Sequence, residues 1–303
     1  MTWTTADIPA QTGRRSLVTG VSVGGIGYDT ALELARAGAA VVLAGRSSDR
    51  LAEAEQAILA EVPAASLELL VVDLASLDSV RRAAAEATDP LDLLVNNAGV
   101  MAPPYSRTDD GFESQLATNH LGPFLLTGLL LPRLRPGARV VTVSSQMHRV
   151  ARKAPLGDPR MPPRRYLRWV AYSQTKLANL LFTFELDRRL AAAGRPVTAV
   201  AAHPGYAGTH LVANGRLGRP SGGLASILGA VNRRVGQSPA AGAWPTLMAA
   251  TADLPGSTYC GPSGPGEAYG RPTVVGCSAL ARDTDAAREL WQISESATGI
   301  GYP

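Results

Sequence analysis

The chain has 303 residues, of which 46% are hydrophobic, and a net charge of +4. This size allows one large α/β domain, and the mild, scattered basic excess argues against a nucleic-acid partner. No apolar run approaches the ~20 residues of a membrane span, and the first residues lack the pattern of a signal peptide. Two cysteines suggest no disulfide framework, although a bridge between Cys260 and Cys277 stays open. We therefore expect a cytoplasmic protein that binds neither nucleic acid nor a membrane.

Short apolar runs alternate with helical patterns through the first two-thirds of the chain. The runs are apolar on both faces, as buried parallel strands are. Alternation at this spacing predicts an α/β fold with a doubly wound parallel sheet. The predicted strands are 16–19, 40–44, 67–72, 91–96, 138–144 and 197–203, and the predicted helices are 26–37, 49–60, 76–86, 111–134 and 171–193.

The composition changes after residue 204. Residues 205–239 are rich in Gly, Ser, Asn and Arg, and residues 255–272 are dense in Gly and Pro, whereas helical patterns return at 240–252 and 283–296. No linker separates a second domain. We expect a single domain over 1–303, with a dinucleotide-binding and catalytic core at 10–204, a substrate loop or lid at 205–240, and a C-terminal extension at 241–303.

The segment "SLVTGVSVGGIG" (16–27) joins the first strand to the first helix. A strand that feeds a glycine-rich turn and then a helix presents backbone N–H groups and a positive helix end to a pyrophosphate. Glycines in such a turn can also be present for packing alone. The residues at the ends of the later strands are therefore needed to distinguish a nucleotide-binding turn from a packing turn.

The ends of the next three strands carry further candidate residues. The second strand ends in Gly45 and Arg46, where an acidic residue would bind a ribose 2′-OH. A guanidinium there can fork onto a 2′-phosphate, which favours NADP(H), with NAD(H) allowed. The alternative is an arginine at the start of a solvated helix. Asp73 and the "NNAG" of 96–99 end the third and fourth strands, at the edge where ligands bind in open α/β sheets.

Tyr172 and Lys176 lie at i and i+4 of a predicted helix, so they share one face. A cation about 5 Å from a phenol at an effective dielectric of ~20 contributes on the order of 3 kcal/mol, or roughly two pK units. We therefore expect Lys176 to lower the pKa of Tyr172 into the range of proton transfer. The chain has 27 arginines and only two lysines, so a lysine at this position indicates a role that arginine cannot fill.

These motifs resemble, in their order, those of the short-chain dehydrogenase/reductase family. They are the Thr-Gly turn, Asp73, "NNAG", "NHLGPF", "VTVSS", "YSQTK" and "HPG", and "YSQTKLANLLF" and "AAHPGYAGTHL" are similar to the retinol-dehydrogenase-like branch and its bacterial relatives. The resemblance implies a single-domain, Rossmann-type, NADP(H)-dependent enzyme that interconverts a carbonyl and an alcohol. We expect a reductase of an apolar small molecule without a metal, and a homo-oligomer (dimer or tetramer) is allowed. The alternative is an NADP(H) sensor or scaffold without catalysis.

The resemblance also assigns roles to individual residues. Tyr172 is the acid/base, Ser145 rather than Ser144 polarises the substrate oxygen, Lys176 holds the nicotinamide ribose, and Asn119 supports Lys176 through a water. The expected cofactor contacts are Gly20, Ser22, Gly25, Ile26, Gly27, Arg46, Asp73, Leu74, Asn97, Ala98, Gly99, Tyr172, Lys176, Pro204, Gly205 and Thr209.

The chain departs from the family spacing in the glycine loop. Four residues rather than three separate Gly20 from Gly25, and the helix pattern that follows is in register from Gly25 onward. The extra residue is therefore confined to 21–24. Since Gly24 can adopt a positive φ, we predict a slightly wider loop that still binds the pyrophosphate.

The segment between Ser145 and Tyr172 is strongly basic, with seven Lys or Arg residues against Asp158. It could attract an anionic substrate or form a solvated basic loop. The sequence leaves both open.

Overall fold

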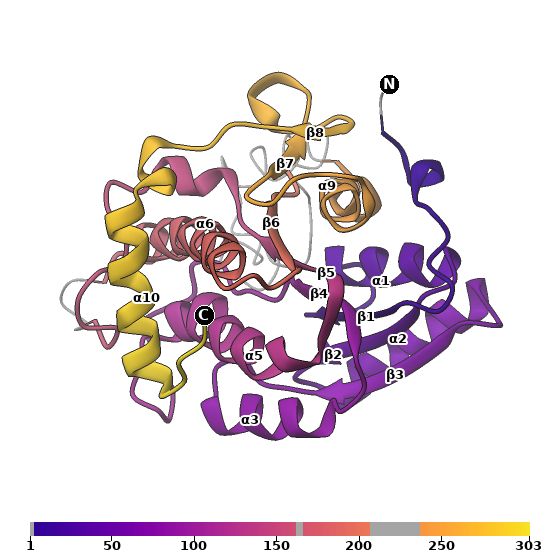
Figure 1. Ribbon diagram of the computed structural model, residues 1–303, viewed down its shortest axis with the longest axis horizontal. Helices are drawn as coiled ribbons and strands as arrows, with labels where there is room; N and C mark the ends of the chain where they lie inside the picture. The colour runs from indigo at the N-terminus through magenta and orange to yellow at the C-terminus, as the bar shows by residue number, and fades with distance from the viewer. Residues whose placement is uncertain (1–2, 162–165, 207–236) are drawn as a thin grey trace, which may run out of the picture.

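An eight-stranded sheet forms the centre of the molecule (Figure 1). The computed structural model describes residues 3–161, 166–206 and 237–303. Within them the strand order is β3-β2-β1-β4-β5-β6-β7-β8, and every pair is parallel except β7 with β8. The strands are β1 (Arg15–Thr19), β2 (Ala40–Gly45), β3 (Ser66–Val71), β4 (Leu91–Asn96), β5 (Leu134–Val143), β6 (Thr198–Ala202), β7 (Tyr259–Pro262) and β8 (Pro272–Val274).

Helices cover both faces of the sheet, as a doubly wound fold requires. One face carries α1 (Ile26–Arg36), α2 (Ser48–Glu61) and α9 (Pro239–Thr251). The other carries α3 (Leu77–Glu86), α5 (Gly122–Leu130) and α6 (Arg168–Ala192), and α10 (Thr284–Thr298) packs outside α6. Figure 1 shows α10 at the edge of the molecule, beside α6 and α5.

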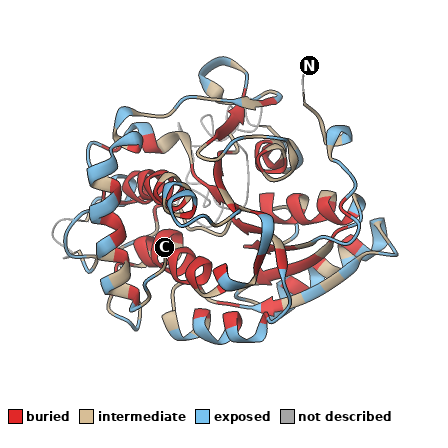
Figure 2. Cartoon of the chain, viewed as in Figure 1, coloured by how far each residue is buried: buried red, intermediate tan, exposed pale blue. Residues whose placement is uncertain are grey.

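The apolar strands form the core. Leu17 and Val18 of β1 are neighbours in sequence and point to opposite faces, yet both are fully buried. This explains why the strands read as continuous apolar runs instead of alternating ones. Figure 2 shows buried residues along the central strands and on the inner sides of the flanking helices.

The six predicted strands and the single-domain α/β fold are confirmed, but two strands were not predicted and one predicted helix was wrong. The strand β7 lies in the Gly/Pro-dense stretch 255–272, and β8 begins at the last residue of that stretch. The predicted helix 111–134 is broken into α4 (Ser114–Leu116), a π-helical turn at Ala117–Leu121, α5, and a 3₁₀ turn at Leu131–Arg133. The N–H of Gly122 bonds to the C=O of Ala117, and Pro123 has no N–H to continue that pattern.

Two other expectations concern the chain as a whole. Most of the predicted substrate loop at 205–240 lies outside the described residues. Among the described residues, no helix is long and apolar enough to cross a membrane.

Candidate active site

The glycine loop turns directly from β1 into α1. Gly20 and Gly24 both have a φ of +75°, so the predicted left-handed conformation at Gly24 is confirmed. The N–H of Gly25 donates to the C=O of Ser22 at 3.0 Å and closes the wider turn, and α1 then begins at Ile26. The extra residue is thus absorbed before the helix starts.

The loop packs tightly against the end of β4. Asn97 donates its side-chain amide to the C=O of Thr19 at 2.7 Å. The Thr19 hydroxyl accepts from the N–H groups of Asn97 and Ala98 at 3.0 and 3.1 Å and lies 3.1 Å from the C=O of Val95. Thr19 therefore joins the end of β1 to the "NNAG" segment at the end of β4 through hydrogen bonds. Sequence reasoning overlooked this role because its partners lie more than 70 residues away.

This close packing requires glycine at position 27. A Cβ on Gly27 would lie 2.5 Å from the Asn97 amide and 2.6 Å from the C=O of Gly20. Gly27→Ala is therefore expected to raise the Kd for NADPH by at least about tenfold and to destabilise the protein by about 1–3 kcal/mol. Fluorescence titration and chemical unfolding measure the two effects.

Gly301→Ala is a suitable control for that variant, because its Cβ would meet only the Glu295 side chain, at 3.6 Å. Equal NADPH binding by the two variants would contradict the close packing.

The first turn of α1 fits a nucleotide pyrophosphate. Its N-cap, Gly25, has no side chain to satisfy the first N–H groups of the helix. These groups and the positive end of the helix dipole are thus left for an external anion. Ser22, Gly25, Ile26 and Gly27 lie at this point, and their contact with a cofactor stays a prediction.

The carboxyl ends of β2 and β3 lie beside this loop. Arg46 follows β2 and is exposed, and among the described residues its guanidinium makes no ion pair. Asp73 follows β3, where its carboxylate accepts from the N–H of Ala75 at 2.9 Å. Leu74 is buried beside it. The three residues thus follow the predicted strand ends, and their contacts with a cofactor stay predictions.

Tyr172 and Ser145 meet at the amino-terminal part of α6. Tyr172 is 7% exposed, and burial raises the pKa of its phenol to about 12, against a lowering influence from a hydrogen bond with the Ser145 side chain. The expected fall of this pKa is therefore wrong for the ligand-free protein, because burial is the largest influence on the phenol and raises its pKa. Ser144 points elsewhere and donates to the C=O of Lys176 at 2.7 Å.

Lys176 is buried one helical turn after Tyr172 on α6. Its ammonium lies 5.7 Å from the centre of the Tyr172 ring and donates to the C=O of Val143 at 3.1 Å. Burial lowers the pKa of Lys176 to about 8. The amide of Asn179 shares the same carbonyl at 3.1 Å, so the end of β5 holds the Lys176 head.

Asn119 lies within the π-helical turn and is buried. Its amide donates to the C=O of Val100 at 2.9 Å and to Thr175 at 3.0 Å, and its carbonyl accepts from the N–H of Val100 at 2.7 Å. A Cβ built on Gly99 would lie 3.1 Å from this carbonyl oxygen and 3.5 Å from the Lys176 ammonium. Asn119 and Lys176 thus flank the same glycine of "NNAG". The water between them stays a prediction.

The remaining predicted cofactor contacts follow β6. Gly205 has a φ of +66°, and Gln237 donates to the C=O of Pro204 at 2.5 Å. Thr209 lies outside the described residues. Trp169 was not predicted: it is 41% exposed and meets the Tyr172 ring edge-on at 6.2 Å. No group of three metal-ligating side chains occurs in the described ranges.

The predicted residues that the structure describes thus lie along one edge of the sheet. An uncapped helix start that can bind an anion and a buried Tyr–Lys pair at this edge suit hydride chemistry between a carbonyl and an alcohol. The protein is in the class of NAD(P)-dependent oxidoreductases that act on small molecules.

Comparison with known proteins identifies the family within this class. The model of the short chain dehydrogenase family matches residues 14–157. Polyprenol dehydrogenase of Mus musculus is 40% identical over 97% of this chain and 86% of its own, and retinol dehydrogenase 13 of Homo sapiens is 38% identical over 96% and 86%. A crystal structure of an uncharacterized protein from Mycobacterium paratuberculosis superposes with a TM-score of 0.83 at 44% identity, covering 100% of both chains. The chain belongs to the short-chain dehydrogenase/reductase family, with retinol-dehydrogenase-like relatives.

Proposed function

We propose that the protein is an NADPH-dependent carbonyl reductase that acts on an apolar ketone or aldehyde. The observation that carries this proposal is the buried pair of Tyr172 and Lys176, with the Ser145 side chain exerting a lowering influence on the pKa of the phenol. The bound nicotinamide would supply or accept the hydride. Residues of the chain would bind it, polarise the carbonyl and deliver the proton.

The protonated form of Tyr172 is the form that reduction requires. A phenol with a pKa of about 12 is protonated at neutral pH, which is the form that donates to a carbonyl oxygen as it gains charge. Ser145 would donate to the same oxygen and stabilise the developing charge. Lys176, still mostly charged at pH 7, would favour the tyrosinate left after transfer.

An apolar substrate is supported by the surface beside Tyr172. Leu167, Trp169 and Val170, around the start of α6, are 67%, 41% and 48% exposed. The relatives named polyprenol dehydrogenase and retinol dehydrogenase 13 also carry the names of apolar alcohols. A cytoplasmic location remains part of the proposal, since Cys260 and Cys277 are both free thiols.

The test is NADPH oxidation by the purified protein with a panel of lipophilic ketones and aldehydes, followed by absorbance. We expect turnover with at least one long-chain or cyclic carbonyl and none without substrate. Tight NADPH binding with no turnover across the panel, or with the matching alcohols and NADP⁺, would instead favour a sensor.

Arg46 is proposed to select NADP(H) through the 2′-phosphate. Its removal deletes a charge-assisted contact that NADH does not make, so Arg46→Ala should raise KM for NADPH about tenfold and leave KM for NADH within about twofold. Steady-state kinetics with both cofactors measure this. Arg36→Ala, at the far end of α1 where Arg36 pairs with Glu33 and Glu61, is the control. An equal change with both cofactors would contradict the assignment.

A further inference from the structure

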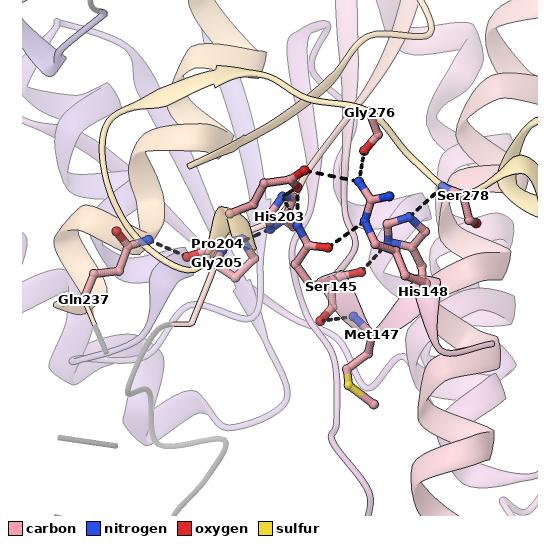
Figure 3. A network of polar contacts seen from close by, with 12 residues as sticks. Ser145, Met147, His148, His203, Pro204, Gly205, Gln237, Gly276 and Ser278 are labelled. Atoms are coloured by element: carbon pink, nitrogen blue, oxygen red, sulfur yellow. Dashed lines mark hydrogen bonds and ion pairs between the residues drawn. The ribbon is translucent and has the colours of Figure 1, made fainter. Parts of the chain in front are cut away.

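A polar network connects the segment that follows Ser145 to the segment that follows β6 (Figure 3). Ser145 is the N-cap of a 3₁₀ turn at Gln146–Arg149, and its hydroxyl accepts from the N–H of Met147 at 3.2 Å. On the other side, His203 precedes Pro204 and Gly205. Backbone hydrogen bonds hold each segment by itself: the N–H of His148 donates to the C=O of Ser145 at 3.0 Å, and the N–H of His203 donates to the C=O of Cys260 at 2.9 Å. Side chains connect the two segments to each other.

Glu267 connects the two segments. One carboxylate oxygen lies 3.0 Å from His203 Nε2 and also accepts from the Gln146 amide. The other accepts from Arg149 at 3.2 Å. Arg149 donates in turn to the side-chain oxygen Oε1 of Gln146 at 2.9 Å and to the backbone C=O of Gly276 at 2.5 Å. The carboxylate therefore holds two members of the Ser145 turn and His203 together.

The bonds fix the protonation of His203. Its Nδ1 accepts from the N–H of Gly205 at 3.2 Å, so Nε2 carries the proton and donates it to Glu267. His203 is fully buried, and burial lowers its pKa to about 3, so the ring stays neutral. The neutral His203 ring thus connects the Glu267 carboxylate, at Nε2, to the backbone N–H of Gly205, at Nδ1.

His148 takes the opposite tautomer on the other side of Ser145. Its Nε2 accepts from the N–H of Ser278 at 3.2 Å, which leaves Nδ1–H to donate to the C=O of Ser145 at 2.7 Å. The two histidines and Glu267 tie both site segments to residues 267–278 of the C-terminal extension. Figure 3 shows the Ser145, His148 and Ser278 part of this network beside His203 and Gly205.

The backbone of Glu267 indicates that its side chain has a specific task. Its φ is +54°, in the left-handed region that side-chain-bearing residues rarely adopt, and it follows Gly266 at +59°. In this conformation the carboxylate reaches His203, Gln146 and Arg149. Its side chain is 24% exposed, so most of it is withdrawn from water.

We infer that Glu267 is a positioning residue that holds the Ser145 hydroxyl in register with the Pro204–Gly205 turn, on which the nicotinamide would rest. This inference rests on the proposed function for its catalytic consequence. Its structural part concerns the ligand-free protein. Sequence reasoning gave no signal for it, because Glu267 is 64 residues from His203 and 121 from Gln146.

The structural part is tested first, by NMR of the ligand-free protein labelled with ¹⁵N-histidine. We expect His203 to carry its proton on Nε2 and His148 on Nδ1. In Glu267→Ala the His203 Nε2–H should exchange faster with water and shift, while His120, bonded to Ser294 elsewhere, stays unchanged. A His203 protonated on Nδ1, or unaffected by the variant, would overturn the inference whatever the enzyme's activity.

The catalytic part is tested by kinetics. Glu267→Ala should lower kcat about tenfold with KM for NADPH within about twofold, and the deuterium isotope effect on kcat from 4-deuterated NADPH should rise. Partial unfolding lowers kcat without changing that isotope effect. Glu267→Gln keeps an acceptor for the His203 Nε2–H, so its kcat should fall less than that of Glu267→Ala. Asp285→Asn, which breaks the exposed ion pair with Arg288, is the matched control and should match wild type.

A double-mutant cycle shows whether Glu267 acts through Ser145. In the Ser145→Ala background, adding Glu267→Ala should lower kcat little further, because the hydroxyl that Glu267 positions is already absent. Multiplicative losses, or an unchanged isotope effect in both Glu267 variants, would overturn the positioning role. If the wild type reduces no carbonyl while the histidine tautomers are as expected, the proposed function fails and the structural part of the inference stands.

Discussion

Replacing Tyr172 by phenylalanine is expected to lower kcat/KM for carbonyl reduction by about 10²–10⁴-fold, the usual contribution of a positioned acid or base. The change removes one hydroxyl and keeps the ring that packs edge-on against Trp169 and lies 5.7 Å from the Lys176 ammonium. The hydride donor and Ser145 are still present. The loss should therefore fall on proton transfer, and NADPH affinity should change little.

Steady-state kinetics and a separate NADPH titration distinguish these effects. Tyr302→Phe is the matched control, because it also removes a buried hydroxyl, one that donates to the C=O of Phe124 at 3.0 Å, remote from Ser145 and Lys176. We expect that variant to keep its kcat. Turnover by Tyr172→Phe within a factor of two of wild type would exclude Tyr172 as the acid.

Sequence patterns predicted the sheet and α1 well because burial and turn chemistry are local. Two-sided apolar runs identified β1 to β6, and the register of helix one placed the extra loop residue before Gly25. The pattern of β7 was hidden, because Gly261 and Pro262 lie within it. A Cβ at 261 would collide with the His203 ring, so tertiary packing accounts for the glycine.

The candidate site divides in the same way. Tyr172 and Lys176 could be paired from spacing alone, whereas the resemblance to the family was needed to choose Ser145 over Ser144. Glu267 and Thr19 act through partners distant in sequence, which no local pattern shows. The sign of the Tyr172 pKa shift was missed for a related reason: the effect of Lys176 was judged without the burial that opposes it.

Lys176 is expected to reduce the stability of the ligand-free protein while supporting its chemistry. Burial lowers its folded pKa to about 8 from an ordinary value of 10.5, so between these values the unfolded chain holds a proton that the folded chain lacks. Stability therefore rises with pH across this window, by about 3 kcal/mol for 2.5 pK units. Below pH 8 the folded protein carries the full penalty of a buried charge.

Lys176→Met removes the charge and keeps much of the apolar stem. At pH 7 this variant should be more stable than wild type by on the order of 1–3 kcal/mol, after the loss of the bond to Val143, and the difference should shrink at pH 10. Urea unfolding at both pH values measures it. Its kcat should fall by about 10²-fold or more, because the tyrosinate loses its cation.

Lys153→Met supplies the control, since Lys153 is the only other lysine and is exposed. It should change neither the stability difference between pH 7 and 10 nor kcat. A Lys176→Met protein that is less stable than wild type at pH 7, or equally shifted at both pH values, would mean that the ammonium stabilises the fold. A buried charge that reduces stability and is nevertheless required for turnover is expected of a group retained for chemistry.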